Sequence, residues 1–183
     1  NRLRHTSPDH SPTPESTQPC LRKQRHQCVW RGLGEGSFIT IFLDTSMTIS
    51  TIINTIVPES GRLDIVDNLF GMAYMLKLEP AVFSTAEALA ETYTGGFWEF
   101  HDLSNGGFYM APRYDTEFTV SCQNGFQGKL SPDAFGITVS LYAFSKLSFG
   151  GDRMALICAS QYHLLREYVA EHPEARAIYR AID

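Results

Sequence analysis

The chain has 183 residues, of which 43% are hydrophobic, and this composition suits one domain with a real core. Residues 1–46 hold six Lys/Arg and four Asp/Glu, a net charge of +2, whereas residues 47–183 hold nine and 16, a net charge of −7. A region at −7 with scattered cations is not expected to bind DNA directly, and the lack of an 18-residue apolar run argues against a membrane helix.

The first 46 residues do not have the composition of a folded domain. Residues 6–19 are rich in Pro, Ser and Thr and contain no apolar side chain, so they cannot bury enough surface to become ordered. Met47 opens the part of the chain with ordinary domain composition. We predict that residues 1–46 are a disordered or non-native extension, for example a translated upstream region, and that residues 47–183 form a single domain. A genuine flexible arm is the alternative for residues 1–46.

The first elements of this domain are an extended segment and a helix. Residues 49–57 are rich in Thr and Ile and are expected to be extended, whereas residues 63–78 are apolar without a clear period and fit either a strand or a helix. Glu79-Pro80 opens a clear amphipathic helix to about Tyr93, which Gly95-Gly96 is expected to end.

Two β-hairpins are predicted next. Strands at 97–103 and 108–112 flank a turn centred on Asn105-Gly106, and a two- or four-residue loop pairs Leu103 with Phe108. This register places one set of side chains on a common face of the hairpin: Trp98, Phe100, Tyr109 and Ala111. Since the other face also carries large apolar groups, one of the two faces is either covered or a contact surface.

The second hairpin has a cleaner alternation of polar and apolar residues. A three-residue loop, residues 123–125, pairs Cys122 with Phe126 and Phe118 with Leu130, and this keeps the apolar residues on one face. It also places Gly125 in the left-handed conformation, where glycine is least strained.

Helices are expected to complete the chain. Ser131 is a predicted N-cap with Pro132 at the first helical position, and the helix to about Leu147 is apolar nearly all round, which indicates a buried central helix. Further helices are expected at about 152–171 and 172–181. The predicted fold class is α+β, a small antiparallel sheet of two consecutive hairpins packed against several helices.

The candidate catalytic and metal-binding residues do not form a recognisable site. His101 and Asp102 are neighbours on a strand and therefore point to opposite faces, and Cys122 has the apolar neighbours of an unreactive core thiol. The histidines and cysteines lack metal-ligand spacing. We therefore predict no catalytic residue, no metal site and no cofactor.

The aromatic hairpin has two interpretations. Its side chains are either ordinary core or part of a contact with a partner protein, because aromatic residues and Arg are enriched at the energetic centres of interfaces. The contact hypothesis assigns partner binding to five residues: Trp98, Phe100, Asn105, Tyr109 and Arg113.

Several short motifs, in order, resemble a known family. The most extensive match is the aromatic stretch 93–112. Further matching segments lie at 57–59, 69–71, 124–137 and 162–166, and in the ending Ile178-Tyr179-Arg180-Ala181-Ile182-Asp183. Together they make residues 55–183 resemble the ArdB/KlcA-type antirestriction proteins of plasmids and genomic islands.

The resemblance implies a function. Such proteins act in the cytoplasm of a bacterial host, where they protect incoming mobile DNA from type I restriction-modification endonucleases without enzymatic activity or a cofactor. The implied partner is the host type I restriction complex or its DNA-translocating state. DNA mimicry is disfavoured, because 16 scattered acids against nine bases do not reproduce one charge per about 1.7 Å of duplex.

The residues alone are also compatible with two other functions. The first alternative is a nucleic-acid-binding regulatory protein of a mobile element, which would use the basic residues of the N-terminal part: Arg22, Lys23, Arg25 and Arg31. The second is a hydrolase that uses His101 and Cys122.

Overall fold

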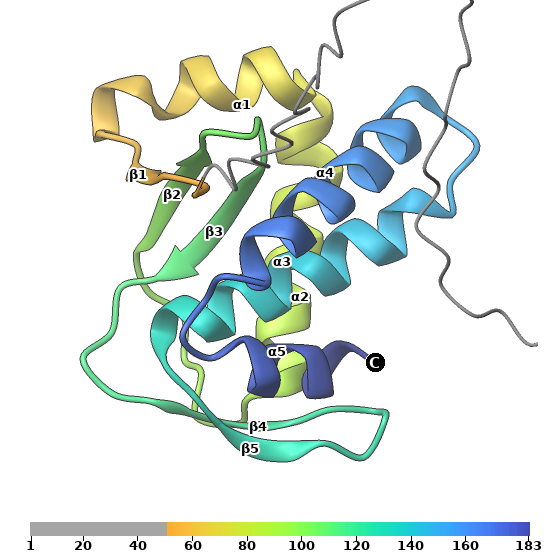
Figure 1. The fold of residues 1–183 in the computed structure, drawn as a ribbon. Coiled ribbons are helices and arrows are strands. Elements are labelled where there is room, and N and C mark those ends of the chain that lie inside the picture. Colours follow the sequence, from red (N-terminus) through yellow and green to blue (C-terminus); the bar gives the residue numbers. More distant parts are fainter. Residues whose placement is uncertain (1–50) are drawn as a thin grey trace, which may run out of the picture. The chain divides into compact units, whose positions relative to one another are not determined.

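The computed structural model describes residues 51–183. This part of the chain contains five α-helices and two small antiparallel sheets, which confirms the predicted α+β class (Figure 1). The two predicted hairpins are both present, but they belong to separate sheets rather than to one sheet. The predicted division between residues 1–46 and the domain lies outside the described residues and stays a prediction.

The amino-terminal part of the described chain is one short strand followed by helical segments. In order these are β1 (Asn54–Ile56), a 3-10 turn (Glu59–Gly61), α1 (Arg62–Phe70), a π-helical turn η2 (Tyr74–Leu78) and α2 (Glu79–Leu89). The stretch 63–78, which the sequence left open between strand and helix, is therefore helical, with a break after α1. Gly71 makes this break, at φ +58°, and its N–H closes the helix by donating to Val66 and Asp67.

Helix α2 ends four residues earlier than predicted. Ala90 is already extended, at φ −134° and ψ 107°, and Tyr93 forms a turn in which its N–H donates to the Ala90 carbonyl. Tyr93 turns back into the core, where its hydroxyl accepts a hydrogen bond from Trp98 Nε1 at 2.8 Å. Tertiary contacts of Tyr93 thus end the helix before Gly95-Gly96 is reached.

The first sheet has the order β1-β2-β3, with β2 (Trp98–Leu103) in the centre and β3 (Phe108–Pro112) at one edge. Both strands agree with the prediction, but the predicted pairing was wrong by one residue: Asp102, not Leu103, lies opposite Phe108. The loop has three residues, because the Leu103 N–H donates to the Gly107 carbonyl at 2.9 Å. Gly106 makes this loop possible at φ +85°, a conformation that other residues rarely adopt.

The corrected register changes the two faces of the hairpin. Cross-strand partners share a face, and the observed pairs are Phe100 with Met110 and His101 with Tyr109. Trp98 and Phe100 therefore lie on one face, and Tyr109 and Ala111 lie on the other. The predicted common face of these four side chains was wrong.

The second hairpin confirms the sequence prediction. β4 (Phe118–Ser121) pairs with β5 (Gln127–Leu130) in the register that sets Phe118 opposite Leu130. The Cys122 N–H donates to the Phe126 carbonyl at 2.8 Å, which closes a three-residue loop, and Gly125 has the predicted left-handed conformation with φ +88°.

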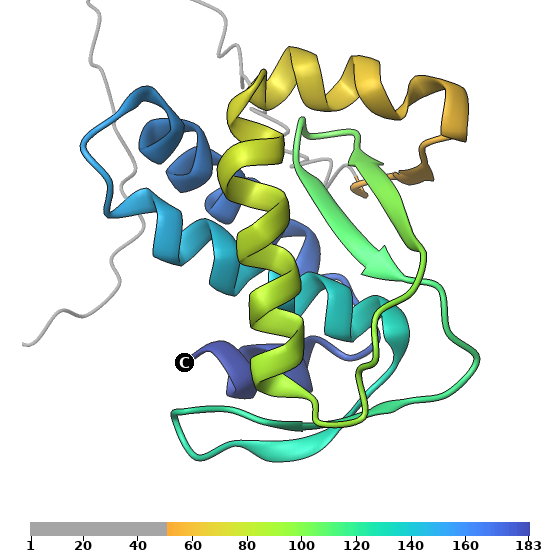
Figure 2. The ribbon, with the colours of Figure 1, turned by 180° about the vertical axis from the view of Figure 1, so that it is seen from behind.

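Helix α3 (Pro132–Ser148) is the centre of the fold. Ser131 caps it as predicted, since its Oγ accepts from the Ala134 N–H at 3.2 Å. In Figures 1 and 2, α3 crosses the middle of the domain, with α2 on one side and α4 (Arg153–Val169) on the other. The second hairpin and α5 (Ala175–Ile182) lie at the end of the domain opposite α1. The predicted burial of this helix is confirmed, because ten of its residues are buried.

Close contact between α3 and β3 fixes the position of the sheet. Gly136 is the residue of α3 that faces this contact, and a Cβ atom there would lie 2.4 Å from Ala111 Cα and 2.5 Å from the Met110 carbonyl oxygen. Ser140, one turn later, accepts a hydrogen bond from the Met110 N–H at 3.2 Å. The backbone of β3 can approach the helix because position 136 has no side chain.

Candidate partner-binding surface

The three aromatic residues predicted to bind a partner are part of the core. Trp98 is 4% exposed and its ring packs 5.7 Å from Phe83, while Phe100 packs against Tyr74 and Phe108. Tyr109 is fully buried on the opposite face of the sheet. These side chains offer almost no contact area to a partner in this structure.

The other two predicted residues lie nearer the surface. Asn105 is half-buried, and its Nδ2 donates to the Leu164 carbonyl at 2.9 Å, so the hairpin tip is attached to α4. Arg113 is exposed and forms an ion pair with Glu99 at 3.3 Å. A partner contact that involves Asn105 and Arg113 stays a prediction.

A hydrogen-bonded polar cluster lies on the face of the first sheet that carries Tyr109. The Tyr109 hydroxyl donates to Asp133 Oδ1 at 2.6 Å and accepts from Asn54 Nδ2 at 2.7 Å. His172 Nε2 lies 3.0 Å from Asp133 Oδ2, and His172 Nδ1 accepts from the Glu174 N–H, which makes Nε2 the proton-bearing nitrogen. The cluster joins β1, β3, the first turn of α3 and the loop between α4 and α5.

His101 extends this cluster. Its ring stacks on Tyr109 with the ring centroids 4.3 Å apart, and its Nδ1 lies 3.0 Å from Asn54 Oδ1. Burial lowers the pKa of His101 below its ordinary value, although the nearby Asp133 carboxylate opposes the shift. His101 is therefore a neutral ring in the folded protein at neutral pH.

Asp133 remains charged although it is partly buried. Burial by itself would raise its pKa, but the hydrogen bonds from His172 and Tyr109 outweigh burial and leave the pKa below its ordinary value. Asp133 also lies in the first turn of α3, where the helix dipole favours a negative charge.

The polar cluster contains a carboxylate hydrogen-bonded to a histidine, as many hydrolase sites do. It does not contain the nucleophile that such a site needs. In the described chain, no Ser, Thr or Cys side chain is hydrogen-bonded to His101 or His172. Cys122 and Cys158 are buried, and burial raises the pKa of Cys122 and brings the pKa of Cys158 to about 11. Thiols with raised pKa values are poor nucleophiles at neutral pH, so the cluster is best explained as a structural network.

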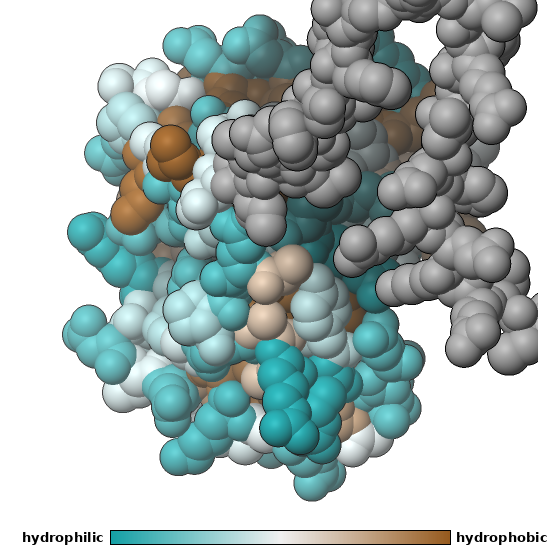
Figure 3. Space-filling model, viewed as in Figure 1, coloured by the Kyte–Doolittle hydropathy of each residue, from teal (hydrophilic) through white to brown (hydrophobic). Residues whose placement is uncertain are grey.

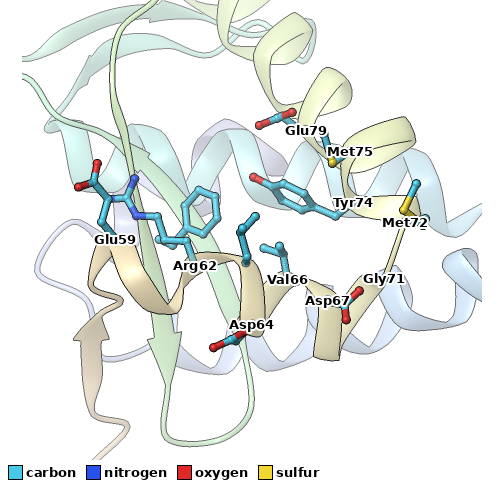
Figure 4. A pocket seen from close by; sticks show the side chains of 12 residues that line it. Glu59, Arg62, Asp64, Val66, Asp67, Gly71, Met72, Tyr74, Met75 and Glu79 are labelled. Atoms are coloured by element: carbon cyan, nitrogen blue, oxygen red, sulfur yellow. The ribbon is translucent and has the colours of Figure 1, made fainter.

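A groove lined largely by apolar side chains lies between α1 and η2. It has a volume of about 530 Å³, and Figure 4 shows Arg62 and Val66 of α1 and Tyr74 of η2 pointing into it. Buried Val66, Tyr74 and Phe100 form its floor. Its size lies within the range of roughly 300–1,000 Å³ typical of binding clefts.

The rim of this groove exposes large apolar side chains. Leu63 is 77% exposed, Met72 is 72% exposed and Met75 is 61% exposed. Met side chains adapt to different partner surfaces, and clustered apolar side chains of this size are typical of interaction sites rather than of ordinary surface. The π-helical turn that carries Met75 is a rare element that often occurs at functional sites.

The groove is also acidic. Four carboxylate residues line it: Glu59, Asp64, Asp67 and Glu79. Arg62, the lining cation, has its guanidinium carbon 4.4 Å from the centre of the Phe97 ring and 5.2 Å from that of Phe100. Its charge is therefore directed at the rings of Phe97 and Phe100.

The net charge of the domain comes from the half of the chain that contains the groove. Residues 51–117 hold ten acids and three bases, a net charge of −7, whereas residues 118–183 hold six of each and are neutral. Four of these ten acids line the groove.

The sequence did not reveal this groove, because residues 63–78 have no clear period and the exposure of an apolar residue depends on its tertiary neighbours. Leu63, Met72 and Met75 are apolar, but they belong to no apolar stripe of a predicted helix. Apolar residues without a predicted place in the core were the only indication in the sequence of an exposed apolar surface.

A second apolar surface is visible over β1 in Figure 3, where Ile53 and Ile56 are exposed. It adjoins the short edge strand β1, and Asp64 and Asp102 lie with Ile56 in the lining of a shallow hollow there.

Within residues 51–183, no three or more His, Cys, Asp or Glu side chains are arranged to hold a metal ion. The helices of this same part of the chain are too short or too polar to span a lipid bilayer.

Comparison with known proteins identifies relatives of the whole described domain. Residues 91–183 match the family model described as antirestriction protein. An antirestriction protein KlcA of Escherichia coli is 45% identical over 139 residues, which are 73% of this chain and 95% of the relative. A second antirestriction protein KlcA of Escherichia coli is 41% identical over 132 residues, which are 70% of this chain and 93% of the relative.

A solved structure has the same fold. It superposes with a TM-score of 0.67 at 40% sequence identity and covers 72% of this chain and 95% of its own. It comes from work on the KlcA and ArdB proteins, which are described as having a novel fold and antirestriction activity against type I DNA restriction systems in vivo but not in vitro.

Proposed function

We infer from its membership of the antirestriction protein family, to which this chain belongs, that it protects incoming mobile DNA by inhibiting type I restriction-modification endonucleases of a bacterial host. The observation that carries the proposal is the similarity to KlcA over 95% of the relative's length, with a shared fold. The protein acts in the cytoplasm of the host, where the restriction complex meets the DNA.

Inhibition is proposed to proceed by binding rather than by catalysis. The polar cluster around Asp133 lacks a nucleophile, and the described cysteines have raised pKa values. An inhibitor that binds needs an accessible apolar surface with specific charges around it, and the groove between α1 and η2 supplies both. We propose this groove as the contact with the restriction complex or with its DNA-translocating state.

A mimic of DNA is disfavoured by the distribution of charge. The acids are concentrated in residues 51–117, and the four that line the groove surround apolar side chains. A DNA mimic requires a long array of carboxylates at about one charge per 1.7 Å of axis. The groove has the composition of a protein contact instead.

The test is the plating efficiency of unmodified phage on a host with a type I restriction system, with and without this protein. We expect the protein to raise plating on the type I host and to leave plating on an isogenic non-restricting host unchanged. A host with a type II enzyme is the matched control for general protection of DNA. Because KlcA and ArdB are described as active in vivo but not in vitro, the measurement is made in cells.

The runner-up is a nucleic-acid-binding regulator that uses the basic residues of segment 1–46. Salt-sensitive DNA binding that is lost on removal of residues 1–46, combined with unchanged phage plating, would support the runner-up against the main proposal.

A further inference from the structure

We propose that the groove between α1 and η2 receives a cationic amphipathic helix of the partner protein, with large apolar side chains on one face and Lys or Arg beside them. This inference rests on the proposed function and adds the chemistry of the segment that is bound. It follows from three properties of the groove: its apolar surface, its charge and its backbone hydrogen bonding.

The apolar surface requires an apolar counterpart. Leu63, Met72 and Met75 are each more than half exposed around a floor that includes Tyr74, and Figure 4 shows the opening between the two helical segments. Burial of these side chains against a partner is favourable because it removes apolar area from water. The bound segment therefore presents large apolar side chains to the groove.

The charge of the groove selects a cationic partner. Glu59 and Asp67 are exposed at its rim, whereas the guanidinium of Arg62 is directed at aromatic rings. Lys77 of η2 is paired with Asp152, and Arg153, which lines an adjoining pocket with Asp67, forms no ion pair with it. Within residues 51–183 neither Glu59 nor Asp67 forms an ion pair, so these carboxylates would attract a basic segment and repel an acidic one.

The same charge disfavours a second copy of this chain as the occupant. Residues 51–117, which include the groove, carry a net charge of −7. Two such regions brought together would repel each other, so a heterologous basic partner is the better match.

Backbone hydrogen bonding favours a helix over an extended segment. The strand that contributes Phe100 to the groove is β2, which is already paired on both sides, with β1 and with β3. An extended peptide could not add to this sheet from within the groove. An amphipathic helix satisfies its own backbone groups and binds through side chains at i, i+3, i+4 and i+7.

Binding of two labelled synthetic helices by the full chain, followed by fluorescence anisotropy, tests the inference. The first helix has Leu at i, i+3, i+4 and i+7 with Lys at the other positions, and the second has the same Leu pattern with Glu in place of Lys. We expect the Leu–Lys helix to bind, with an affinity that falls as salt increases, and the Leu–Glu helix not to bind.

Matched variants separate the groove from the general negative charge of the protein. Glu59→Lys combined with Asp67→Lys should weaken binding of the Leu–Lys helix about tenfold, since two favourable pairs become repulsive. Asp115→Lys combined with Glu117→Lys makes the same change of net charge at exposed positions before β4 and should change affinity less than about twofold. Equal weakening by the two charge variants would overturn the inference.

The apolar part of the contact has its own control. Leu63→Ser combined with Met75→Ser should weaken binding, whereas Phe149→Ser, which removes an exposed apolar side chain after α3, should not. These side chains are exposed, so the variants are expected to fold, and a thermal melt of each checks this. Loss of affinity confined to the groove variants supports the inference, and an unchanged affinity in Leu63→Ser/Met75→Ser overturns it.

Phage plating for the same proteins keeps this inference distinct from the proposed function. Protection by the wild-type chain without a preference for the Leu–Lys helix would overturn the inference and leave the function standing. Absence of protection by the well-folded wild-type chain would overturn the function itself.

Discussion

Single residues of the aromatic hairpin separate a structural role from a binding role. Trp98 is buried and donates to the Tyr93 hydroxyl, whereas Arg113 is exposed at the end of the same hairpin. The two residues lie within one segment that resembles the family, so the resemblance alone did not distinguish them. Burial assigns Trp98 to the core and leaves Arg113 available to a partner.

We predict that Trp98→Ala lowers the free energy of unfolding by about 3–5 kcal/mol, because it removes a large buried side chain and leaves a cavity. Arg113→Ala should change it by less than about 0.5 kcal/mol, since the Arg113–Glu99 pair is exposed. Thermal and denaturant melts measure both effects. A large loss of stability in Arg113→Ala, or a small one in Trp98→Ala, would contradict the assignment.

The polar cluster predicts how stability depends on pH. His101 has a lowered pKa in the folded protein, so the unfolded chain binds more protons as pH falls below the ordinary value of 6.5. Stability should therefore decrease as pH falls from about 7 toward 5. Asp133 also has a lowered pKa, and its contribution is present above its ordinary value of 3.8 and is lost as pH falls through the lower folded value.

Urea titrations between pH 8 and pH 3 measure this dependence, with His101→Gln as the control. The variant should lose much of the decline between pH 7 and pH 5 and retain the decline at lower pH. An unchanged profile in His101→Gln would show that other groups are responsible.

At the level of elements, the clarity of the hydrophobic pattern decided what the sequence could predict. The second hairpin alternates cleanly between apolar and polar residues, so a shift by one residue would expose its whole apolar set, and its register was predicted correctly. The first hairpin is apolar on both faces, so alternation cannot distinguish neighbouring registers, and the prediction was wrong by one residue.

The end of α2 and the groove required tertiary information. Tyr93 continues the helical stripe in sequence, but its contacts with Trp98 and Phe118 take it out of the helix. Leu63 and Met75 are apolar, yet nothing local to them specifies that they remain exposed. The capped helix α3, in contrast, carries its own start signals in Ser131 and Pro132 and was predicted correctly.

The contact between α3 and β3 predicts an unusual effect of alanine in a helix. Gly136→Ala should destabilise the protein by about 1–3 kcal/mol, because the new Cβ would overlap the β3 backbone. In an ordinary helix the same change stabilises by about 0.5–1 kcal/mol, so the two cases differ in sign. Gly151→Ala, at a position with nothing within 4 Å of the new Cβ, is the control and should be nearly neutral. A stabilised Gly136→Ala variant would contradict the described packing.

At the level of the whole molecule, the domain that resembles the family is expected to be sufficient for function. Every motif of the resemblance lies after Met47. We predict that a chain of residues 47–183 protects phage DNA on a type I restricting host as well as the full chain does. Loss of protection by a truncated chain with a normal melting transition would assign a role to residues 1–46.

The central claim is that this protein inhibits type I restriction by binding and not by catalysis, and the dose dependence of protection tests it most directly. Plating efficiency of unmodified phage is measured over a range of protein levels, with the numbers of inhibitor and restriction complex per cell determined by quantitative immunoblotting. The account predicts that protection rises in proportion to the inhibitor and saturates only when it equals or exceeds the restriction complex in number. Full protection by a small number of molecules against a large excess of restriction complexes would contradict it, because that result requires turnover.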